Sequence, residues 1–247
     1  MAERGWALVT GAGGRIGRAL ALAAGEAGYD VIVHHRTSKL GADETVAAIE
    51  AMGRRARASA AELTDPGACR ALIETAERPI TLLVNSASLF ADDVIETLTP
   101  EAWNAVMAVN ALAPLLLAQA FAAALPADRE GLIVNITDQR VWRLNPRFFS
   151  YTMAKAALWA ATQTLAQALA PRIRVNAIGP GPTIQSIHQT TDDFAAEAAA
   201  VPLGHGPAPA EIGHALRYLI DAPSVTGQMI AVDGGQHLAW RTPDAII

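Results

Sequence analysis

Residues 6–17 read Trp-Ala-Leu-Val-Thr-Gly-Ala-Gly-Gly-Arg-Ile-Gly, which is a short apolar run, a glycine-rich turn and the start of a helical pattern. The run predicts a buried strand, and the residues from Ile16 onward predict a helix. We expect Gly11 to permit the tight turn between them and Gly17 to let the helix approach the strand closely. A strand, a glycine-rich turn and a helix in this order indicate the first unit of a doubly wound α/β fold.

The rest of the chain repeats this alternation, because short β-branched runs are separated by longer Ala- and Leu-rich stretches. Such an alternation is typical of repeated βα units around a parallel sheet. The predicted strands are Trp6–Val9, Asp30–His34, Ala56–Ala60, Ile80–Asn85, Gly131–Ile136, Arg172–Ile178 and Gln228–Val232. The predicted helices are Ile16–Ala27, Ala42–Met52, Pro66–Glu74, Pro100–Ala124, Phe149–Leu169 and Pro209–Leu219. The sequence therefore predicts an α/β protein with a single doubly wound Rossmann-type domain over residues 1–247, in which helices flank a seven-stranded parallel sheet.

Bulk composition limits the class of protein. Hydrophobic residues make up 51% of the 247 residues and charged residues 17%, which predicts a large buried core and excludes a disordered chain. The net charge of -5 and the scattered basic residues predict no nucleic-acid partner. Cys69 is the single cysteine and the six histidines lack ligand spacing, so we expect neither an internal disulfide nor a metal site.

The apolar stretch from Ala105 to Leu125 raises the question of a membrane span. It is rich in alanine and is interrupted by Asn110 and Pro114, so we expect a packed helix and no transmembrane segment. The N-terminus leads directly into the first predicted strand without an export signal, which predicts a cytoplasmic protein.

One segment, from Gly179 to His205, departs from the βα rhythm. It follows the sixth predicted strand and contains several prolines and glycines. Long loops in compact domains are often functional, so we predict that the residues at about 180–205 form a substrate lid. A passive surface loop is the alternative.

The glycine-rich turn and the helix behind it suit an anionic ligand. Exposed N–H groups and the dipole at a helix N-terminus favour a pyrophosphate, and an ordinary βα turn is the alternative. Where an acidic residue would bind the ribose of NAD, the chain reads His34-His35-Arg36-Thr37-Ser38 and has no carboxylate. Because a guanidinium and two hydroxyls suit a 2′-phosphate, we predict NADP(H) as the cofactor, unless Arg36 is a solvated surface charge.

Tyr151 and Lys155 lie four residues apart near the start of the predicted helix Phe149–Leu169. At this spacing a phenol and an ammonium share one helical face. The ordinary pKa of tyrosine is about 10, and we expect the ammonium, together with an oxidised nicotinamide, to lower the pKa of Tyr151 toward neutrality. The pair therefore predicts acid–base work.

Taken together, these motifs resemble the short-chain dehydrogenase/reductase family over nearly the whole chain. The family order is matched by the Thr10–Gly17 turn, Asn85-Ser86-Ala87-Ser88, Asn110, Tyr151 with Lys155, Pro180-Gly181 and Val232-Asp233-Gly234-Gly235. The resemblance implies a homotetramer or homodimer in which Tyr151 donates a proton, Lys155 holds the nicotinamide ribose and Asn110 anchors a proton-relay water. It also implies cofactor contacts from Gly11, Gly14, Arg15, Ile16, Gly17, His35, Arg36, Thr37, Ser38, Glu62, Leu63, Asn85, Ser86, Ala87, Lys155, Pro180 and Gly181.

Three departures narrow the resemblance. Asp138 stands thirteen residues before Tyr151, where the family generally has serine. Arg15 replaces a usual glycine of the turn, and Ser88-Leu89-Phe90 follows the Asn85 motif. This combination is similar to the pteridine reductase and dihydromonapterin reductase branch, which implies a pterin substrate. The implied substrate contacts are Arg15, Ser88, Phe90, Asp138 and Tyr151, and the implied catalytic set is Asn110, Asp138, Tyr151 and Lys155.

The chemistry of these side chains supports the same substrate. A planar ring that stacks against Phe90 gains about 0.5–1.5 kcal/mol beyond its burial. Asp138 can exchange hydrogen bonds with ring nitrogens or an amino group, and Arg15 can donate to a ring oxygen or a cofactor phosphate. The alternatives are that Phe90 is a core aromatic and that Arg15 serves the pyrophosphate alone.

Three functions are consistent with the sequence. The first is an NADPH-dependent oxidoreductase that transfers hydride to a pteridine-like C=N bond. The second is a general carbonyl or 3-oxoacyl reductase of the same family, in which Asp138 substitutes for the usual serine. The third is a non-catalytic NADP-binding sensor, which the intact Asn110, Tyr151 and Lys155 disfavour.

Overall fold

The structure, a computed structural model, describes residues 4–74 and 76–240. Within them, one seven-stranded sheet has the order β3-β2-β1-β4-β5-β6-β7, and every neighbouring pair of strands is parallel. The strands are β1 (Trp6–Val9), β2 (Asp30–His35), β3 (Ala56–Ala60), β4 (Ile80–Asn85), β5 (Gly131–Ile136), β6 (Ile173–Pro180) and β7 (Met229–Val232). The predicted doubly wound fold is confirmed. Chain order reverses between β1 and β4, which is where open α/β sheets bind ligands.

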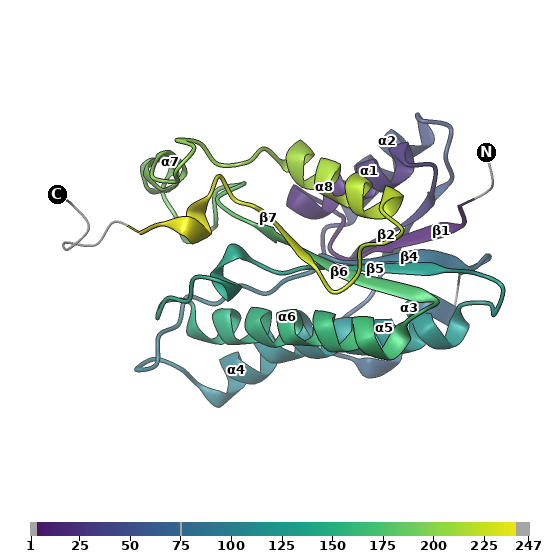
Figure 1. The fold of residues 1–247 in the computed structure, drawn as a ribbon, viewed down its shortest axis with the longest axis horizontal. Coiled ribbons are helices and arrows are strands. Elements are labelled where there is room, and N and C mark those ends of the chain that lie inside the picture. The colour runs from purple at the N-terminus through teal and green to yellow at the C-terminus, as the bar shows by residue number, and fades with distance from the viewer. Residues whose placement is uncertain (1–3, 75, 241–247) are drawn as a thin grey trace.

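Helices cover both faces of the sheet (Figure 1). One face carries α1 (Arg15–Glu26), α2 (Lys39–Glu50) and α8 (Pro209–Asp221). The other carries α3 (Pro66–Glu74), α4 (Pro100–Met107), the π-helix η1 (Ala108–Leu112), α5 (Ala113–Ala124) and α6 (Phe149–Leu169). Two 3₁₀ turns, η2 (Gln139–Val141) and η3 (Gln236–Leu238), and the helix α7 (Thr191–Ala199) complete the elements.

Two segments differ from the predicted helices. The continuous helix expected over Pro100–Ala124 is interrupted by η1, because Pro114 carries no N–H to donate to the carbonyl of Asn110 four residues earlier. The expected lid contains α7, which the sequence analysis missed although Thr190 and Asp193 form a capping box at its start. The π-helix therefore places an irregular backbone at Asn110. Residues 180–205, which we call the lid after this prediction, are partly helical.

The hydrophobic core consists of two layers, one on each face of the sheet. In β1, Ala7 and Val9 pack on the side of α1, whereas Trp6 and Leu8 pack on the side of α5. All four side chains are buried. This explains why the parallel strands read as continuous apolar runs instead of alternating patterns.

The stretch Pro100–Ala124 is long and apolar enough to cross a membrane by length and composition, and half of its apolar window is buried within the fold. Leu117, Ala118 and Phe121 pack into the core layer below the sheet. This stretch is therefore a core element, in agreement with the predicted packed helix.

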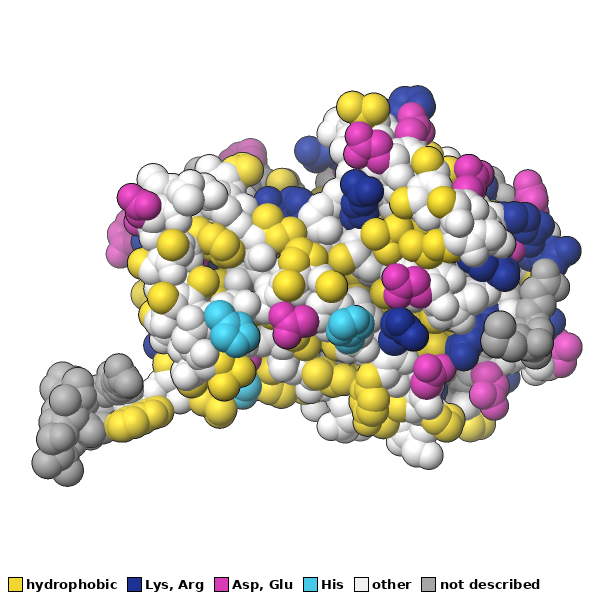
Figure 2. Space-filling model, turned by 90° about the horizontal axis from the view of Figure 1, so that it is seen from above, with side chains coloured by type: hydrophobic (Ala, Val, Ile, Leu, Met, Phe, Trp, Pro, Cys, Tyr) yellow, Lys and Arg dark blue, Asp and Glu magenta, His cyan; other side chains and the backbone are white. Residues whose placement is uncertain are grey.

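Charges of both signs are interspersed on the face that α1, α2 and α8 cover. Figure 2 shows this face from above, with lysine and arginine lying among aspartate and glutamate. Individual pairs such as Arg18 with Glu44 and Arg217 with Glu26 lie 3.5 and 3.2 Å apart. The described residues of that face form no continuous basic surface.

A chain of buried polar side chains ties the middle of the sheet to α6. Asn85 donates from Nδ2 to Oδ1 of Asn135 at 2.8 Å, and Asn135 donates from Nδ2 to Oγ1 of Thr162 at 2.9 Å. Thr162 then donates to the carbonyl oxygen of Leu158 at 2.8 Å. Because none of these groups can reach water, the loss of one link leaves a buried donor unsatisfied.

We expect Thr162→Val to lower the free energy of unfolding by about 1–3 kcal/mol, because it keeps the side-chain shape and removes the acceptor for Asn135. Thr164→Val is the matched control, since Thr164 lies on the same helix and its exposed hydroxyl bonds only within its own turn. This control should change the free energy by less than about 0.5 kcal/mol. Urea denaturation checks both values. An equal loss in the two variants would contradict a special role for the buried chain.

Candidate active site

An open cavity of about 840 Å³ lies at the carboxyl edge of the sheet. Its walls come from the β1–α1 turn, the ends of β2, β4, β5 and β6, the start of α6 and the lid. The sequence-predicted site residues that line it are Gly11, Gly14, Arg15, Ile16, Gly17, His35, Arg36, Thr37, Ser38, Glu62, Leu63, Ser86, Ala87, Ser88, Phe90, Asp138, Tyr151, Lys155, Pro180 and Gly181. Asn85 and Asn110 lie behind this wall, so the fold gathers the predicted side chains into one place with two exceptions.

The glycine-rich turn is shaped by close backbone contacts. Gly11 has φ +66°, and a Cβ there would lie 2.9 Å from the Cα of Ala87. A Cβ on Gly17 would lie 2.1 Å from the carbonyl oxygen of Gly11. Gly14, in contrast, is extended and faces open space. The first two glycines let the helix start close to the strand, and the third leaves room for a ligand.

The N-terminus of α1 is suited to an anion. Gly14 is the N-cap residue and provides no side-chain cap, so the first N–H groups of the helix are not bonded by a capping side chain. Together with the helix dipole, such groups stabilise a pyrophosphate. The site therefore fits the phosphates of a dinucleotide.

His34 stabilises the glycine-rich turn through hydrogen bonds, a role that the sequence analysis did not assign. Its Nδ1 accepts a hydrogen bond from the N–H of Gly11 at 3.0 Å, and its Nε2 lies 3.2 Å from the carbonyl oxygen of Ala61. Burial lowers the pKa of His34 to about 4, so the ring is neutral at physiological pH. A neutral ring keeps both hydrogen bonds.

The end of β2 carries the residues predicted to bind a 2′-phosphate. Arg36, Thr37 and Ser38 line the cavity, and the guanidinium of Arg36 lies 4.0 Å from the carboxylate of Glu62 at its closest approach. Ser38 donates to the carbonyl oxygen of Gly13 at 3.2 Å. A largely exposed cation on the cavity wall suits a phosphate monoester.

Tyr151 and Asp138 form the centre of the site. The Tyr151 hydroxyl donates to Oδ2 of Asp138 at 2.9 Å, and the backbone N–H of Arg140 donates to Oδ1 at 2.8 Å. Lys155 donates from Nζ to the carbonyl oxygen of Ile136 at 2.7 Å. Burial lowers the pKa of Lys155 to about 8, against the attraction of the Asp138 carboxylate.

The protein groups alone do not lower the pKa of Tyr151, and the expected lowering by Lys155 together with an oxidised nicotinamide stays a prediction. Burial and the adjacent Asp138 carboxylate raise the pKa of Tyr151 well above its ordinary value. Burial also raises the pKa of Asp138, while Arg140 opposes that shift. Tyr151 is therefore held as a phenol, which is the form that donates a proton.

An aromatic wall stands beside the phenol. The ring of Phe90 stacks on Phe148 with centroids 4.3 Å apart, and it meets the edge of Tyr151 at 4.6 Å. His188 of the lid lies 5.8 Å from Phe90, and its Nε2 is 3.2 Å from the Phe90 carbonyl oxygen. Phe148, which the sequence analysis missed, has φ +54°, a left-handed conformation that is strained for a bulky side chain.

Arg15 points to the lid. Its guanidinium donates to the carbonyl oxygens of Gln185 and Ile184 at 3.0 and 3.2 Å. Arg15 also lines the cavity, so its expected contact with the pterin or a cofactor phosphate stays a prediction. Arg15 also has φ +53°, which explains why glycine is usual at this position.

The side chains of Asn110 and Asn85 form hydrogen bonds with other residues of the protein and do not line the cavity. The side-chain amide of Asn110 accepts from the N–H of Leu89 and donates to the Leu89 carbonyl oxygen, both at 2.7 Å. It thus fixes the segment that carries Phe90. Asn85 bonds to Asn135, and its own Oδ1 is buried without a partner among the described residues.

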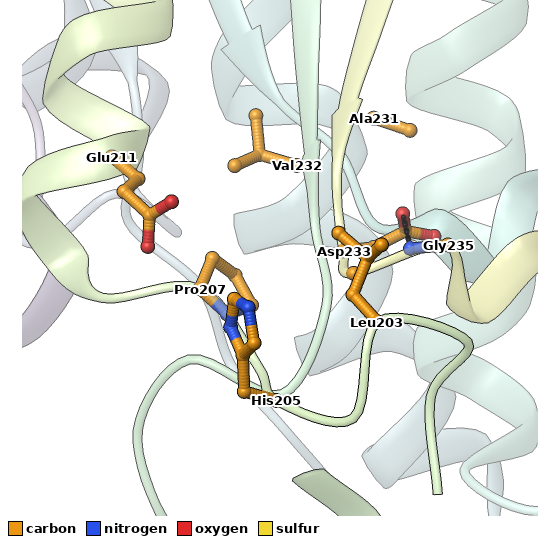
Figure 3. Close-up of a pocket in the computed structure, with 9 residues that line it drawn as sticks. Leu203, His205, Pro207, Glu211, Ala231, Val232, Asp233 and Gly235 are labelled. Carbon is orange, nitrogen blue, oxygen red and sulfur yellow. Dashed lines mark hydrogen bonds between the residues drawn. The ribbon is translucent and has the colours of Figure 1, made fainter. Parts of the chain in front are cut away.

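A second, smaller cavity lies off the end of β7 (Figure 3). It has about 230 Å³ and is bordered by His205, Glu211 and Asp233, among others. Asp233 is already engaged, because it accepts from the N–H of Gly235 at 2.9 Å and lies 2.7 Å from Nδ1 of His237. Of the side chains predicted to be catalytic, Asp138, Tyr151 and Lys155 line the larger cavity.

Comparison with known proteins identifies reductases that are similar to this chain. A sequence profile described as Enoyl-(Acyl carrier protein) reductase matches residues 11–237. FolM alternative dihydrofolate reductase 1 from Brucella suis, solved in complex with NADP, is 47% identical with a TM-score of 0.94, and 99% of each chain is covered. An uncharacterized oxidoreductase of Methylorubrum extorquens is 35% identical over 93% of this chain and 96% of its own. A 3-oxoacyl-[acyl-carrier-protein] reductase of Synechocystis sp. is 34% identical over 93% of this chain and 95% of its own.

We expect Arg15→Gly to loosen the lid without destabilising the fold. Glycine removes a left-handed strain of about 1–2 kcal/mol, and it also removes both hydrogen bonds to the lid backbone. Limited proteolysis should cleave the lid faster, while thermal unfolding stays level or shifts upward. Arg15→Lys is the comparison, because lysine keeps the strain and one cationic donor. If the lid of Arg15→Gly is cleaved at the same rate as that of the wild type, the hydrogen bonds of Arg15 do not hold the lid in place.

Proposed function

This chain belongs to the short-chain dehydrogenase/reductase family, and we propose that within this family it reduces a pterin-like substrate at a C=N bond. It is an NADP-dependent oxidoreductase, as the family profile and the NADP complex of its structural relative show. The observation that carries the finer proposal is the hydrogen bond between Tyr151 and Asp138, which places a carboxylate next to a phenol in the cavity.

The cavity can hold the cofactor with the residues described above. The uncapped start of α1 would take the pyrophosphate and Arg36 the 2′-phosphate. Bound NADPH would supply the hydride. Lys155 lies 5.5 Å from the Tyr151 ring centroid, and from there it would donate to ribose hydroxyls.

Tyr151 would deliver the proton. Its raised pKa keeps the hydroxyl protonated throughout the physiological range, so the proton is present when a substrate arrives. The hydroxyl already points at Asp138, and a ring nitrogen next to Asp138 would lie within its reach. Lys155, buried on the same helix face, favours the phenolate that remains after transfer.

The neighbouring groups fit a flat heterocycle with N–H donors. Phe90 offers an aromatic wall beside Tyr151, and Asp138 offers carboxylate oxygens that accept from an amino group or ring N–H. A bond of this kind to a charged acceptor contributes about 1.5–3 kcal/mol. The relative from Brucella suis is named as a dihydrofolate reductase, and dihydrofolate contains such a ring.

A carbonyl or 3-oxoacyl reductase is the second candidate. Relatives that are 30–34% identical carry the name 3-oxoacyl-[acyl-carrier-protein] reductase. The Tyr151 hydroxyl would protonate a carbonyl oxygen as well as a nitrogen. Asp138 argues against this candidate, because a carboxylate repels the oxyanion that develops on a reduced ketone. The third hypothesis, a non-catalytic sensor, is superseded by the assignment as an oxidoreductase.

We expect wild type to oxidise NADPH with dihydrobiopterin, dihydromonapterin or dihydrofolate faster than with an activated ketone. In Asp138→Ser, kcat/KM for the pterins should fall about 10- to 100-fold, since a charge-assisted hydrogen bond is lost. Asp138→Asn is the isosteric control and should behave like the serine variant, because its amide carries no charge. Turnover of the ketone alone would support the general carbonyl reductase.

We further propose that the chain forms a homodimer or homotetramer through the stretch Pro100–Ala124, which comprises α4, η1 and α5, and through α6. Leu112 and Leu115 are 48% and 36% exposed on the outer side of this helical layer. Leu115→Glu should convert the assembly to a smaller species, as measured by light scattering, because a charge disfavours an apolar interface. Leu40→Glu, at a 75% exposed position on α2, should leave the assembly unchanged. A monomeric wild type would overturn this proposal.

A further inference from the structure

Arg140 lies between two parts of the proposed substrate site. Its Nε is 4.0 Å from Oδ1 of Asp138, and its backbone N–H donates to the same oxygen at 2.8 Å. Its guanidinium carbon lies 5.0 Å from the ring centroid of Phe148, the residue that stacks behind Phe90. One side chain thus contacts both the carboxylate and the support of the aromatic wall.

The position of Arg140 is unfavourable for folding. Its side chain is 15% exposed, and Nη1 is buried without a hydrogen-bond partner among the described residues. A buried donor without a partner destabilises the folded state. Arg143, three residues further on, is exposed to solvent. The Arg140 guanidinium is present although its burial lowers the stability of the folded state, which indicates a role other than folding.

We propose that Arg140 is a positioning residue that sets the substrate preference of the site by orienting Asp138 and Phe148 together. The backbone N–H of Arg140 and the Tyr151 hydroxyl hold the orientation of the carboxylate by hydrogen bonds, and the guanidinium, 4.0 Å away, acts on the same carboxylate through its positive charge. It also holds the Phe148–Phe90 stack at a defined distance from that carboxylate. The substrate class that fits both is a planar nitrogen heterocycle whose N–H donors lie on one edge. This inference rests on the proposed function, because it refines how the pterin-like ring is chosen.

The charge of Arg140 also acts on the Asp138–Tyr151 pair. Asp138 is faced by Arg140 from η2 and by Tyr151 and Lys155 from α6, whereas Arg15 is engaged by the lid. The guanidinium favours the ionised carboxylate, so its removal raises the pKa of Asp138. If the ionised carboxylate binds the substrate, the acid limb of the pH profile moves to higher pH.

The test compares Arg140→Gln, Arg140→Lys and the matched control Arg143→Gln in the full-length protein with NADPH. In Arg140→Gln, we expect kcat/KM for dihydrobiopterin to fall about tenfold or more, and the acid limb to move up by about 1–3 pH units. Activity with a ketone should change less than twofold, and the melting temperature should not fall. Arg140→Lys should restore the acid limb, because it keeps the charge, and Arg143→Gln should match wild type.

Two results would overturn the proposal: equal losses for pterin and ketone, or an unchanged acid limb in Arg140→Gln. If wild type turns over no pterin, the proposed function fails on its own. The role of Arg140 is then tested by the pKa of Asp138, measured from its carboxyl ¹³C signal and assigned by comparison with Asp138→Asn. An Asp138 pKa that is equal in wild type and Arg140→Gln would refute the positioning role, and a raised value would support it.

Discussion

The parallel direction of all strands is the constraint on which the site depends. Carboxyl ends of parallel strands meet at one edge, so segments far apart in sequence end beside each other. β1 ends at Val9, and the hydroxyl oxygen of the next residue, Thr10, accepts from the N–H groups of Ser86 and Ala87 after β4. β5 ends shortly before Asp138, and β6 ends at Pro180. The topology of the sheet therefore brings the segments of the cavity wall together, and the side chains on these segments determine which ligand is bound.

Within that edge, burial decides the electrostatics. Tyr151, Asp138 and Lys155 lie together on the cavity wall, and desolvation by burial is the largest cause of the pKa shift of each. Burial favours the neutral form of every group, and the mutual contacts only partly oppose it. A phenol held protonated next to the Asp138 carboxyl group is the consequence. It stores a proton at the position where hydride transfer to a substrate would require one.

The fold was predictable because it follows from sequence patterns that can be recognised without knowledge of tertiary contacts. Apolar runs, glycine-rich turns and the order of motifs identified each strand, and every predicted strand is present with small shifts at its ends. The direction of the Arg15 side chain was not predictable, since it depends on a lid 170 residues away. The role of Arg140 was hidden for a similar reason. Its significance comes from distances to Asp138 and Phe148, and no spacing in sequence encodes them.

Backbone strain gives a further reason to assign functions to the cavity rim. Among the described residues, Arg15 and Phe148 are the non-glycine residues with positive φ, and both line the cavity. Glycine at either position would remove a strain of about 1–3 kcal/mol. The presence of a long cationic side chain and an aromatic ring at these two strained positions indicates that the site needs both side chains. Arg15 tethers the lid, and Phe148 supports the wall that Phe90 presents. The strain is thus located where the site must hold its shape around a ligand.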